Sequence, residues 1–285
     1  MTDNIQTIDV PGAPYGVTIA ADGATWFSMA TTGAIGRYRD GTVDTFGLDP
    51  ADGQPTVIIE GPDAAMWFTE FRGHRIGRIS ADGERTSIGA HAPYGLCVGP
   101  DGALWFTELQ AGHIARLGVD GKIARFPVRG MPSMIVAGPD AALWFTLNQA
   151  NAIGRSTTAG EITVYPLPTE SANPVGITAG PDGALWFVEI GAGQIGRIST
   201  DGAIDEFPLP DRAARPHAII TGPDQALWFT EWGAGRLGRI TTDGEITSVE
   251  LPGAEPHGLA AGADGIITVA MESGVLARVP VNALS

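Results

Sequence analysis

The chain has 285 residues with 17 basic and 32 acidic side chains, and this net charge of −15 at pH 7 argues against nucleic acid as a partner, because phosphate backbones are repelled. Cys97 is the only cysteine, which excludes an intrachain disulfide and a metal site built from cysteines. No charged n-region with an apolar h-region opens the sequence and no run approaches about 18 apolar residues, so we expect a cytoplasmic protein with no membrane partner.

A repeat of about 40 residues runs through the whole chain. Its most regular segment reads Gly-Pro-Asp-Gly-Ala-Leu-Trp-Phe-Thr-Glu, with small variations from copy to copy. The tryptophans of six copies are Trp26, Trp67, Trp105, Trp144, Trp186 and Trp228. A seventh copy around residues 265–269 has Thr268 at the position of the tryptophan.

Each copy predicts four short strands. It opens on Pro-x-Gly, as in Pro14-Tyr15-Gly16-Val17, and turns at Pro-Asp-Gly. The Leu-Trp-Phe segment, an Ile-Gly-Arg-Ile segment, an Asp-Gly turn and a tail ending in proline follow. The runs are β-rich, and the dipeptides between them suit tight hairpins. Seven such copies predict an all-β fold, a seven-bladed β-propeller of four-stranded blades that forms one domain over residues 1–285.

The N-terminal strand is predicted to close the ring. Residues 4–11 resemble the tail strand of a repeat, and the last copy ends after residues 275–278 without a tail strand of its own. The N-terminal strand can therefore complete the last blade and cover two sheet edges. An open solenoid is the alternative architecture, but it would need distinct capping repeats at its ends. A closed ring with an acidic surface also favours a monomer.

One arginine recurs at the same place in every copy. Because it recurs once per blade, we interpret it as part of the scaffold and not as a ligand contact. These arginines are Arg37, Arg78, Arg116, Arg155, Arg197, Arg239 and Arg278.

The residue after each opening proline is expected at the rim of the central channel. Around the ring these residues are Tyr15, Thr56, Tyr94, Ser133, Val175, His217 and His257. Two neighbouring blades thus contribute imidazoles, the side chains that titrate near neutrality. The other three histidines, His74, His91 and His113, are expected in solvated loops or turns.

Two glutamates are predicted to lie beside His257. Glu255 precedes it by two residues, so an extended backbone would point both side chains the same way. A hairpin that turns on Asp264-Gly265 would place Glu272 opposite His257. Glu272 also follows its copy's Thr268 by one residue more than the repeat glutamates follow their tryptophans, which changes its face in a strand. The repeat glutamates are Glu70, Glu108, Glu189 and Glu231.

Two carboxylates and an imidazole at one rim suit a divalent cation beside a general base. Mg²⁺ typically takes one or two carboxylates and leaves its other positions for water and substrate oxygens. The cation could polarise a carbonyl while His257 removes a proton. The alternative interpretation is a polar channel mouth whose charges are only solvated.

The chain resembles the virginiamycin B lyases over all seven repeats. The most specific segments are Arg215-Pro216-His217-Ala218-Ile219, Trp228-Phe229-Thr230-Glu231-Trp232-Gly233-Ala234, Glu255-Pro256-His257-Gly258 and Ala270-Met271-Glu272. The resemblance implies a seven-bladed propeller that confers antibiotic resistance by linearising cyclic streptogramin B depsipeptides. It implies elimination at the threonine ester, without water and with Mg²⁺.

The resemblance also implies a role for each of four residues. His257 would be the proton acceptor and His217 would contact substrate, while Glu255 and Glu272 would hold the metal. Two other functions fit a propeller of this composition. One is a scaffold that only binds a peptide or protein at its rim, and the other is a metal-dependent, lactonase-like hydrolase.

Overall fold

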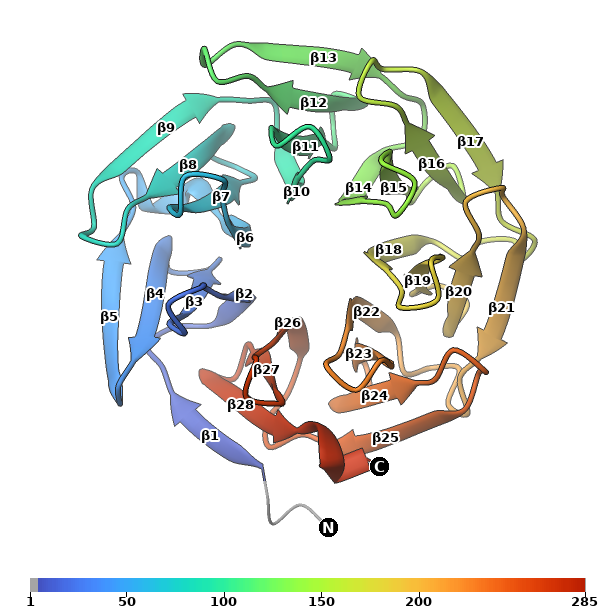
Figure 1. The fold of residues 1–285 in the computed structure, drawn as a ribbon. Helices are drawn as coiled ribbons and strands as arrows, with labels where there is room; N and C mark the ends of the chain where they lie inside the picture. The colour runs from blue at the N-terminus through green and yellow to red at the C-terminus, as the bar shows by residue number, and fades with distance from the viewer. Residues whose placement is uncertain (1–4, 285) are drawn as a thin grey trace.

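Short apolar runs separated by glycine-containing turns fold into seven four-stranded antiparallel sheets arranged in a ring (Figure 1). The structure is a computed structural model that describes residues 5–284. It confirms the predicted seven-bladed β-propeller of four-stranded blades. Residue 4 of the predicted first strand lies outside the described residues.

Blades one to three follow one another along the first part of the chain. Blade one contains β2 (Pro14–Ile19), β3 (Thr25–Met29), β4 (Ala34–Arg39) and β5 (Thr42–Gly47). Blade two contains β6 (Pro55–Glu60), β7 (Met66–Glu70), β8 (Arg75–Ile79) and β9 (Arg85–Gly89). Blade three contains β10 (Pro93–Val98), β11 (Leu104–Glu108), β12 (His113–Leu117) and β13 (Ile123–Pro127).

The next three blades have the same order of strands. Blade four contains β14 (Pro132–Ala137), β15 (Leu143–Leu147), β16 (Ala152–Ser156) and β17 (Ile162–Pro166). Blade five contains β18 (Pro174–Ala179), β19 (Leu185–Glu189), β20 (Gln194–Ile198) and β21 (Ile204–Pro208). Blade six contains β22 (Pro216–Thr221), β23 (Leu227–Glu231), β24 (Arg236–Ile240) and β25 (Ile246–Glu250).

Blade seven joins the two ends of the chain. Its inner strands are β26 (Pro256–Ala261), β27 (Ile266–Met271) and β28 (Val275–Pro280), and its outer strand is β1 (Gln6–Asp9). β1 pairs with β28 in antiparallel register, from Gln6 opposite Arg278 to Asp9 opposite Val275. Figure 1 shows β1 beside β28 at the closure of the ring. The predicted closure by the N-terminal strand is therefore confirmed.

In the part of the chain that the structure describes, helix is confined to two short 3₁₀ turns, η1 (Ala51–Gly53) and η2 (Val281–Leu284). Over residues 5–284, neither these turns nor any other helical segment has the length and apolarity needed to cross a membrane.

The hydrophobic core lies between neighbouring blades. Trp186 of blade five is fully buried against Ile219 and Leu227 of blade six. Trp228 of blade six packs in the same way against Val269 of blade seven. Because each tryptophan fills the space beside the next blade, the repeat stabilises the ring as a whole.

In blades two to six, the turn aspartate connects the turn to the tryptophan and to the repeat arginine. In blade six, Trp228 Nε1 donates to Asp224 Oδ1 at 2.9 Å and Arg239 Nε donates to Asp224 Oδ2 at 2.7 Å. Six of the seven repeat arginines pair with a turn aspartate in this manner, and Arg37 pairs instead with Asp44. The arginines are scaffold residues, as predicted.

A β-bulge follows the opening proline of every blade. The register between the first two strands shifts between this proline and the third residue after it. A bulge leaves residues out of the regular ladder and turns a side chain away from its normal direction. The residue after the proline lies within this irregular stretch, which removes it from the usual alternation of faces.

Candidate active site at the channel rim

Three repeat positions build the rim of the ring. They are the residue before the opening proline, the residue after it, and the residue after the second strand. In blade seven these are Glu255, His257 and Glu272, and in blade six they are Arg215, His217 and Trp232. A backbone hydrogen bond joins the outer two in each blade, from Glu272 N to Glu255 O at 3.2 Å and from Trp232 N to Arg215 O at 3.1 Å.

The backbone at Glu255 is left-handed, with a φ of 55°. The predicted extended conformation at this residue is therefore wrong. The same position is left-handed in five other blades, at Gln54, Ala92, Met131, Asn173 and Arg215. The conformation belongs to the repeat, and the exposed carboxylate is what distinguishes Glu255 from its counterparts.

The predicted register of His257 opposite Glu272 is also wrong, although the two side chains do meet. Pro256 pairs with Met271 and Leu259 with Val269, because the bulge takes His257 out of the ladder. Glu272 lies one residue beyond the end of β27. Even so, His257 Nε2 lies 3.0 Å from Glu272 Oε1. The structure therefore brings the predicted base and one predicted metal ligand together.

His257 is enclosed by aromatic rings and is 7% exposed. Its ring centroid lies 4.3 Å from that of Tyr15 with an interplanar angle of 31°, and 4.9 Å from that of His217 in an edge-on contact. Trp232 lies further away, with ring centroids 6.4 Å apart. The site thus combines side chains from blades one, six and seven.

Both rim histidines are held in the neutral form. Burial, with a further contribution from His217, lowers the pKa of His257 to about 3. Burial alone lowers the pKa of His217 to about 4. Neither ring nitrogen of His257 has a hydrogen-bond partner, since the contact with Glu272 lacks hydrogen-bond geometry. Nδ1 of His217 is likewise buried without a partner. Within residues 5–284, these buried nitrogens are therefore not committed to any hydrogen bond of the fold.

The two rim carboxylates are in direct contact. Burial, a side-chain hydrogen bond with Glu255 and repulsion from Glu255 raise the pKa of Glu272 to about 7. A divalent cation between two such groups would relieve the repulsion that otherwise favours protonation. Among residues 5–284, no three His, Cys, Asp or Glu side chains form a metal-holding group. The pair Glu255 and Glu272 nevertheless provides the one or two protein carboxylates that a cation such as Mg²⁺ needs.

The other three histidines differ from one another in environment. His91 is exposed as predicted, and His74 Nδ1 accepts a hydrogen bond from the Ala92 backbone N–H at 3.0 Å. His113 begins β12 and is not in a turn. The prediction of a turn failed there because the third strand starts at that residue.

Tyr15 and Trp232 are neighbours of His257. Tyr15 was predicted at the channel rim but without a committed role in the site, and Trp232 was not predicted as a site residue. The Nε1 of Trp232 is buried and has no partner. Arg215 lies over the Trp232 ring at 5.2 Å, and both residues line a groove of about 500 Å³ that reaches Glu255. The three rim positions, compared from blade to blade, are the sequence signal that would have identified these two residues.

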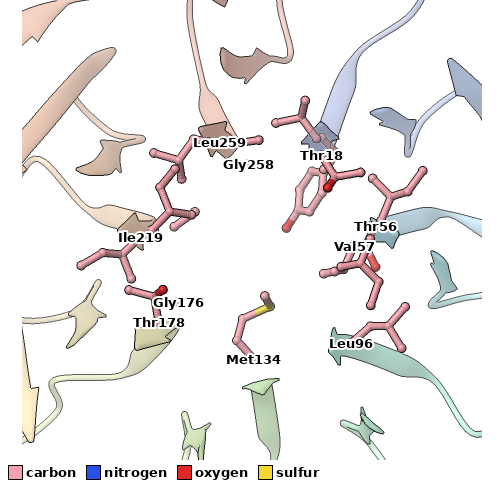
Figure 2. Close-up of a pocket in the computed structure, with 18 of the residues that line it drawn as sticks. Thr18, Thr56, Val57, Leu96, Met134, Gly176, Thr178, Ile219, Gly258 and Leu259 are labelled. Atoms are coloured by element: carbon pink, nitrogen blue, oxygen red, sulfur yellow. The ribbon is translucent and has the colours of Figure 1, made fainter. Parts of the chain in front are cut away.

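A second cavity of about 360 Å³ occupies the central channel and is mostly apolar. It is lined by five of the seven residues predicted there, namely Tyr15, Thr56, Tyr94, Val175 and His217. Figure 2 shows the aliphatic side chains deeper in this channel, including Leu96, Met134 and Leu259. His217 and Tyr15 therefore belong both to the rim and to the channel wall.

Comparison with known proteins identifies virginiamycin B lyases among the similar chains. Residues 2–279 match the model of the virginiamycin B lyase family. A virginiamycin B lyase from Nocardia farcinica is 54% identical over 177 residues, which are 62% of this chain. The matched stretch covers 63% of that curated relative, which is less than two thirds of its length.

Solved structures are similar over nearly the full length. Selenomethionine-substituted virginiamycin B lyase from Staphylococcus aureus is 40% identical, covers 96% of this chain and 98% of its own, and superposes with a TM-score of 0.93. A catalytically inactive histidine-to-alanine variant of the same lyase, solved with quinupristin, is 39% identical over the same shares with a TM-score of 0.92.

Proposed function

Because the chain belongs to the virginiamycin B lyase family, we propose that it is a carbon–oxygen lyase that opens cyclic streptogramin B depsipeptides. The observation that carries this proposal is the arrangement around His257. A neutral imidazole with two unsatisfied nitrogens lies 3.0 Å from one of a pair of touching carboxylates. This arrangement offers a proton acceptor next to a cation site.

The base in this proposal is His257, acting through Nε2, the nitrogen that lies toward Glu272. It takes the Cα proton of the threonine residue whose side-chain oxygen closes the ring. The released electron pair forms the Cα–Cβ double bond, and the Cβ–O bond breaks with its electrons on the departing carboxylate. A histidine that is neutral at pH 7 can accept this proton without first losing one.

The carboxylates of Glu255 and Glu272 would hold Mg²⁺. When bound, the cation supplies Lewis-acid polarisation of substrate carbonyl oxygens, which acidifies the Cα–H bond. Glu272 also fixes the distance between this site and His257, since it contacts both the imidazole and the second carboxylate.

His217 and the groove beside Glu255 would bind and orient the depsipeptide. The partnerless Nδ1 of His217 provides a hydrogen-bonding group one blade away from the base. The Trp232 ring and Arg215 provide an aromatic and cationic wall along the groove. Binding there would place the ester bond over His257, and opening of the ring would make the host tolerant of the antibiotic.

The mass of the product tests the proposed reaction. The protein is incubated with a streptogramin B and Mg²⁺, and the product is measured by mass spectrometry. Elimination opens the ring without a change in mass, so a linear product of unchanged mass is expected. A product heavier by one water would show a hydrolase, and recovery of the cyclic compound would show a protein that only binds.

The variant His257→Ala is the matched control for this assay. Its turnover is expected to fall by at least about 10³-fold, because removal of a general base costs the acid–base contribution. Circular dichroism should show that the propeller is intact, since the imidazole makes no hydrogen bond in the fold. Substantial ring opening by this variant would exclude His257 as the base.

A further inference from the structure

A hydrogen bond between two tyrosines spans part of the channel rim. The hydroxyls of Tyr15 and Tyr94 lie 2.8 Å apart, although the residues belong to blades one and three. Each follows the opening proline of its first strand, so both occupy the repeat position that holds His257 in blade seven. Burial raises the pKa of both hydroxyls, so the pair remains neutral and hydrogen-bonded over the working pH range.

The orientation of His257 depends on ring packing. Histidines in functional sites are usually oriented by a hydrogen bond to one ring nitrogen. Neither nitrogen of His257 makes such a bond. The nearest ring is that of Tyr15, 4.3 Å away and tilted by 31°, which leaves Tyr15 as the principal neighbour that limits rotation of the imidazole.

Blades one and seven approach closely enough to hold Tyr15 against His257. A Cβ atom at Gly258 would lie 2.8 Å from the backbone oxygen of Tyr15 and 3.1 Å from the Cα atom of Gly16. The glycine after His257 therefore allows the backbone of Tyr15 to pass directly beside it. At its far end, the hydroxyl of Tyr15 is hydrogen-bonded to Tyr94 of blade three, while the ring centroid of His217 lies 6.0 Å from that of Tyr15 in an edge-on arrangement.

Tyr94 provides this hydrogen bond from a fixed position. Its backbone carbonyl accepts a hydrogen bond from Thr69 Oγ1 at 2.8 Å, and its ring is in edge-on contact with Phe71 at 6.2 Å. Both contacts come from blade two. Within residues 5–284, no ring contact joins Tyr94 to His257 itself, so any influence of Tyr94 on the base passes through Tyr15.

We propose that Tyr94 is a positioning residue that orients the base His257 through the hydroxyl of Tyr15. The hydrogen bond holds the Tyr15 ring against the imidazole, which keeps Nε2 directed toward Glu272 and the substrate. Tyr94 thereby makes blade three part of a site whose chemistry lies in blades six and seven. The kinetic consequence rests on the proposed function, whereas the structural consequence does not.

The kinetic test uses Tyr94→Phe, Tyr15→Phe and the double variant with a streptogramin B and Mg²⁺. Each single variant should lower kcat by about tenfold with little change in KM, because a misplaced base slows the chemical step and not binding. The double variant should be no slower than either single one. Additive losses, or a wild-type kcat in Tyr94→Phe, would overturn the inference. Tyr165→Phe, which removes a hydroxyl from a tyrosine stacked on Trp144 in blade four, is the matched control and should behave as wild type.

A second measurement does not depend on activity. The ring current of Tyr15 should shift the imidazole proton resonances of His257, which are assigned by their loss in His257→Gln. Tyr94→Phe should move these resonances, and Tyr165→Phe should leave them in place. Unchanged His257 resonances in Tyr94→Phe would overturn the inference even if the protein opened no streptogramin B. Absence of turnover by the wild-type protein would instead contradict the proposed function.

Discussion

Blades six and seven carry different side chains at the rim on the same backbone hydrogen bond. Glu272 takes the place that Trp232 holds in blade six, and Glu255 takes that of Arg215. An aromatic and cationic pair in one blade thus becomes a pair of carboxylates in the next. The identical backbone hydrogen bond in both blades shows that the exchange concerns side-chain chemistry alone.

Removing one rim carboxylate should selectively weaken the binding of the Mg²⁺ that we propose for this site. Glu272→Gln is expected to raise the Mg²⁺ concentration needed for half-maximal ring opening by about 10- to 100-fold, because one of two anionic ligands is lost. Glu255→Gln should act in the same direction. The measurement is a Mg²⁺ titration of turnover.

Glu231→Gln is the control for that titration. Glu231 ends β23 one residue before the rim position and is paired with Arg236. It should leave the Mg²⁺ dependence unchanged. Equal damage from Glu231→Gln and Glu272→Gln would contradict the distinction between repeat and rim glutamates.

Glu189 is a repeat glutamate whose charge is not compensated. The arginine that pairs with Glu70 and Glu231 in their blades is replaced here by Gln194, which donates one hydrogen bond to the carboxyl at 2.7 Å. Glu189 is fully buried, and its Oε1 has no partner. Burial raises its pKa from 4.5 to about 7.

The raised pKa predicts a loss of stability as the pH increases. The folded protein keeps the Glu189 proton up to about pH 7, whereas the unfolded chain releases it near 4.5. The stability that the Glu189 proton contributes to the folded state is fully present below pH 4.5, decreases between pH 4.5 and pH 7, and is lost above pH 7. Glu189→Gln should therefore gain about 3 kcal/mol relative to wild type between pH 5 and pH 8. Urea unfolding at several pH values measures the difference, and an equal pH dependence of the two proteins would contradict it.

At the scale of single residues, the repeat pointed to the candidate side chains, whereas the backbone geometry around them could not be predicted. His257, His217 and the two glutamates were identifiable because they break a pattern seen in the other copies. The bulge after Pro256 and the left-handed Glu255 were not, since neither has a residue signature in the sequence. Despite these two differences from the predicted backbone, the side chains of His257 and Glu272 lie together.

At the scale of strands, the turn aspartates explain why each blade forms as a unit. Asp224 accepts from Trp228 and Arg239 at once, so one side chain connects a turn to the second and third strands of its blade. The dipeptide turns and alternating runs predicted these strands well. Blade seven differs from the others in that its outer strand comes from the other end of the chain, as predicted.

Deletion of residues 1–10 should therefore destabilise blade seven. The variant loses the pairing of β1 with β28 and the contacts of Ile8 and Val10 with the core between blades one and seven. We expect a loss of roughly 2–4 kcal/mol, about 1 kcal/mol for each ladder hydrogen bond, and self-association through the exposed edge of β28.

Thermal unfolding and size-exclusion chromatography measure these two effects. A synthetic peptide of residues 1–12 should restore both the melting temperature and the monomer, since it can occupy the same edge. A truncated protein that remains monomeric with an unchanged melting temperature would show that β1 is dispensable.

At the scale of the whole molecule, the fold was predictable because the same physical pattern is repeated seven times. A wrong strand assignment in one copy of the repeat can be corrected by comparison with the other copies. The site had no such redundancy. The site combines Tyr15 from blade one with His257 from blade seven. The contact between these two residues depends on the geometry with which the seven blades close the ring.

Closure of the ring by β1 has a consequence for the timing of synthesis. Tyr15 of blade one is synthesised well before the residues of blade seven. A nascent chain with six finished blades still lacks His257, Glu255, Glu272 and the partner strand for β1. The candidate site should therefore assemble only once β28 has been made and β1 can pair with it.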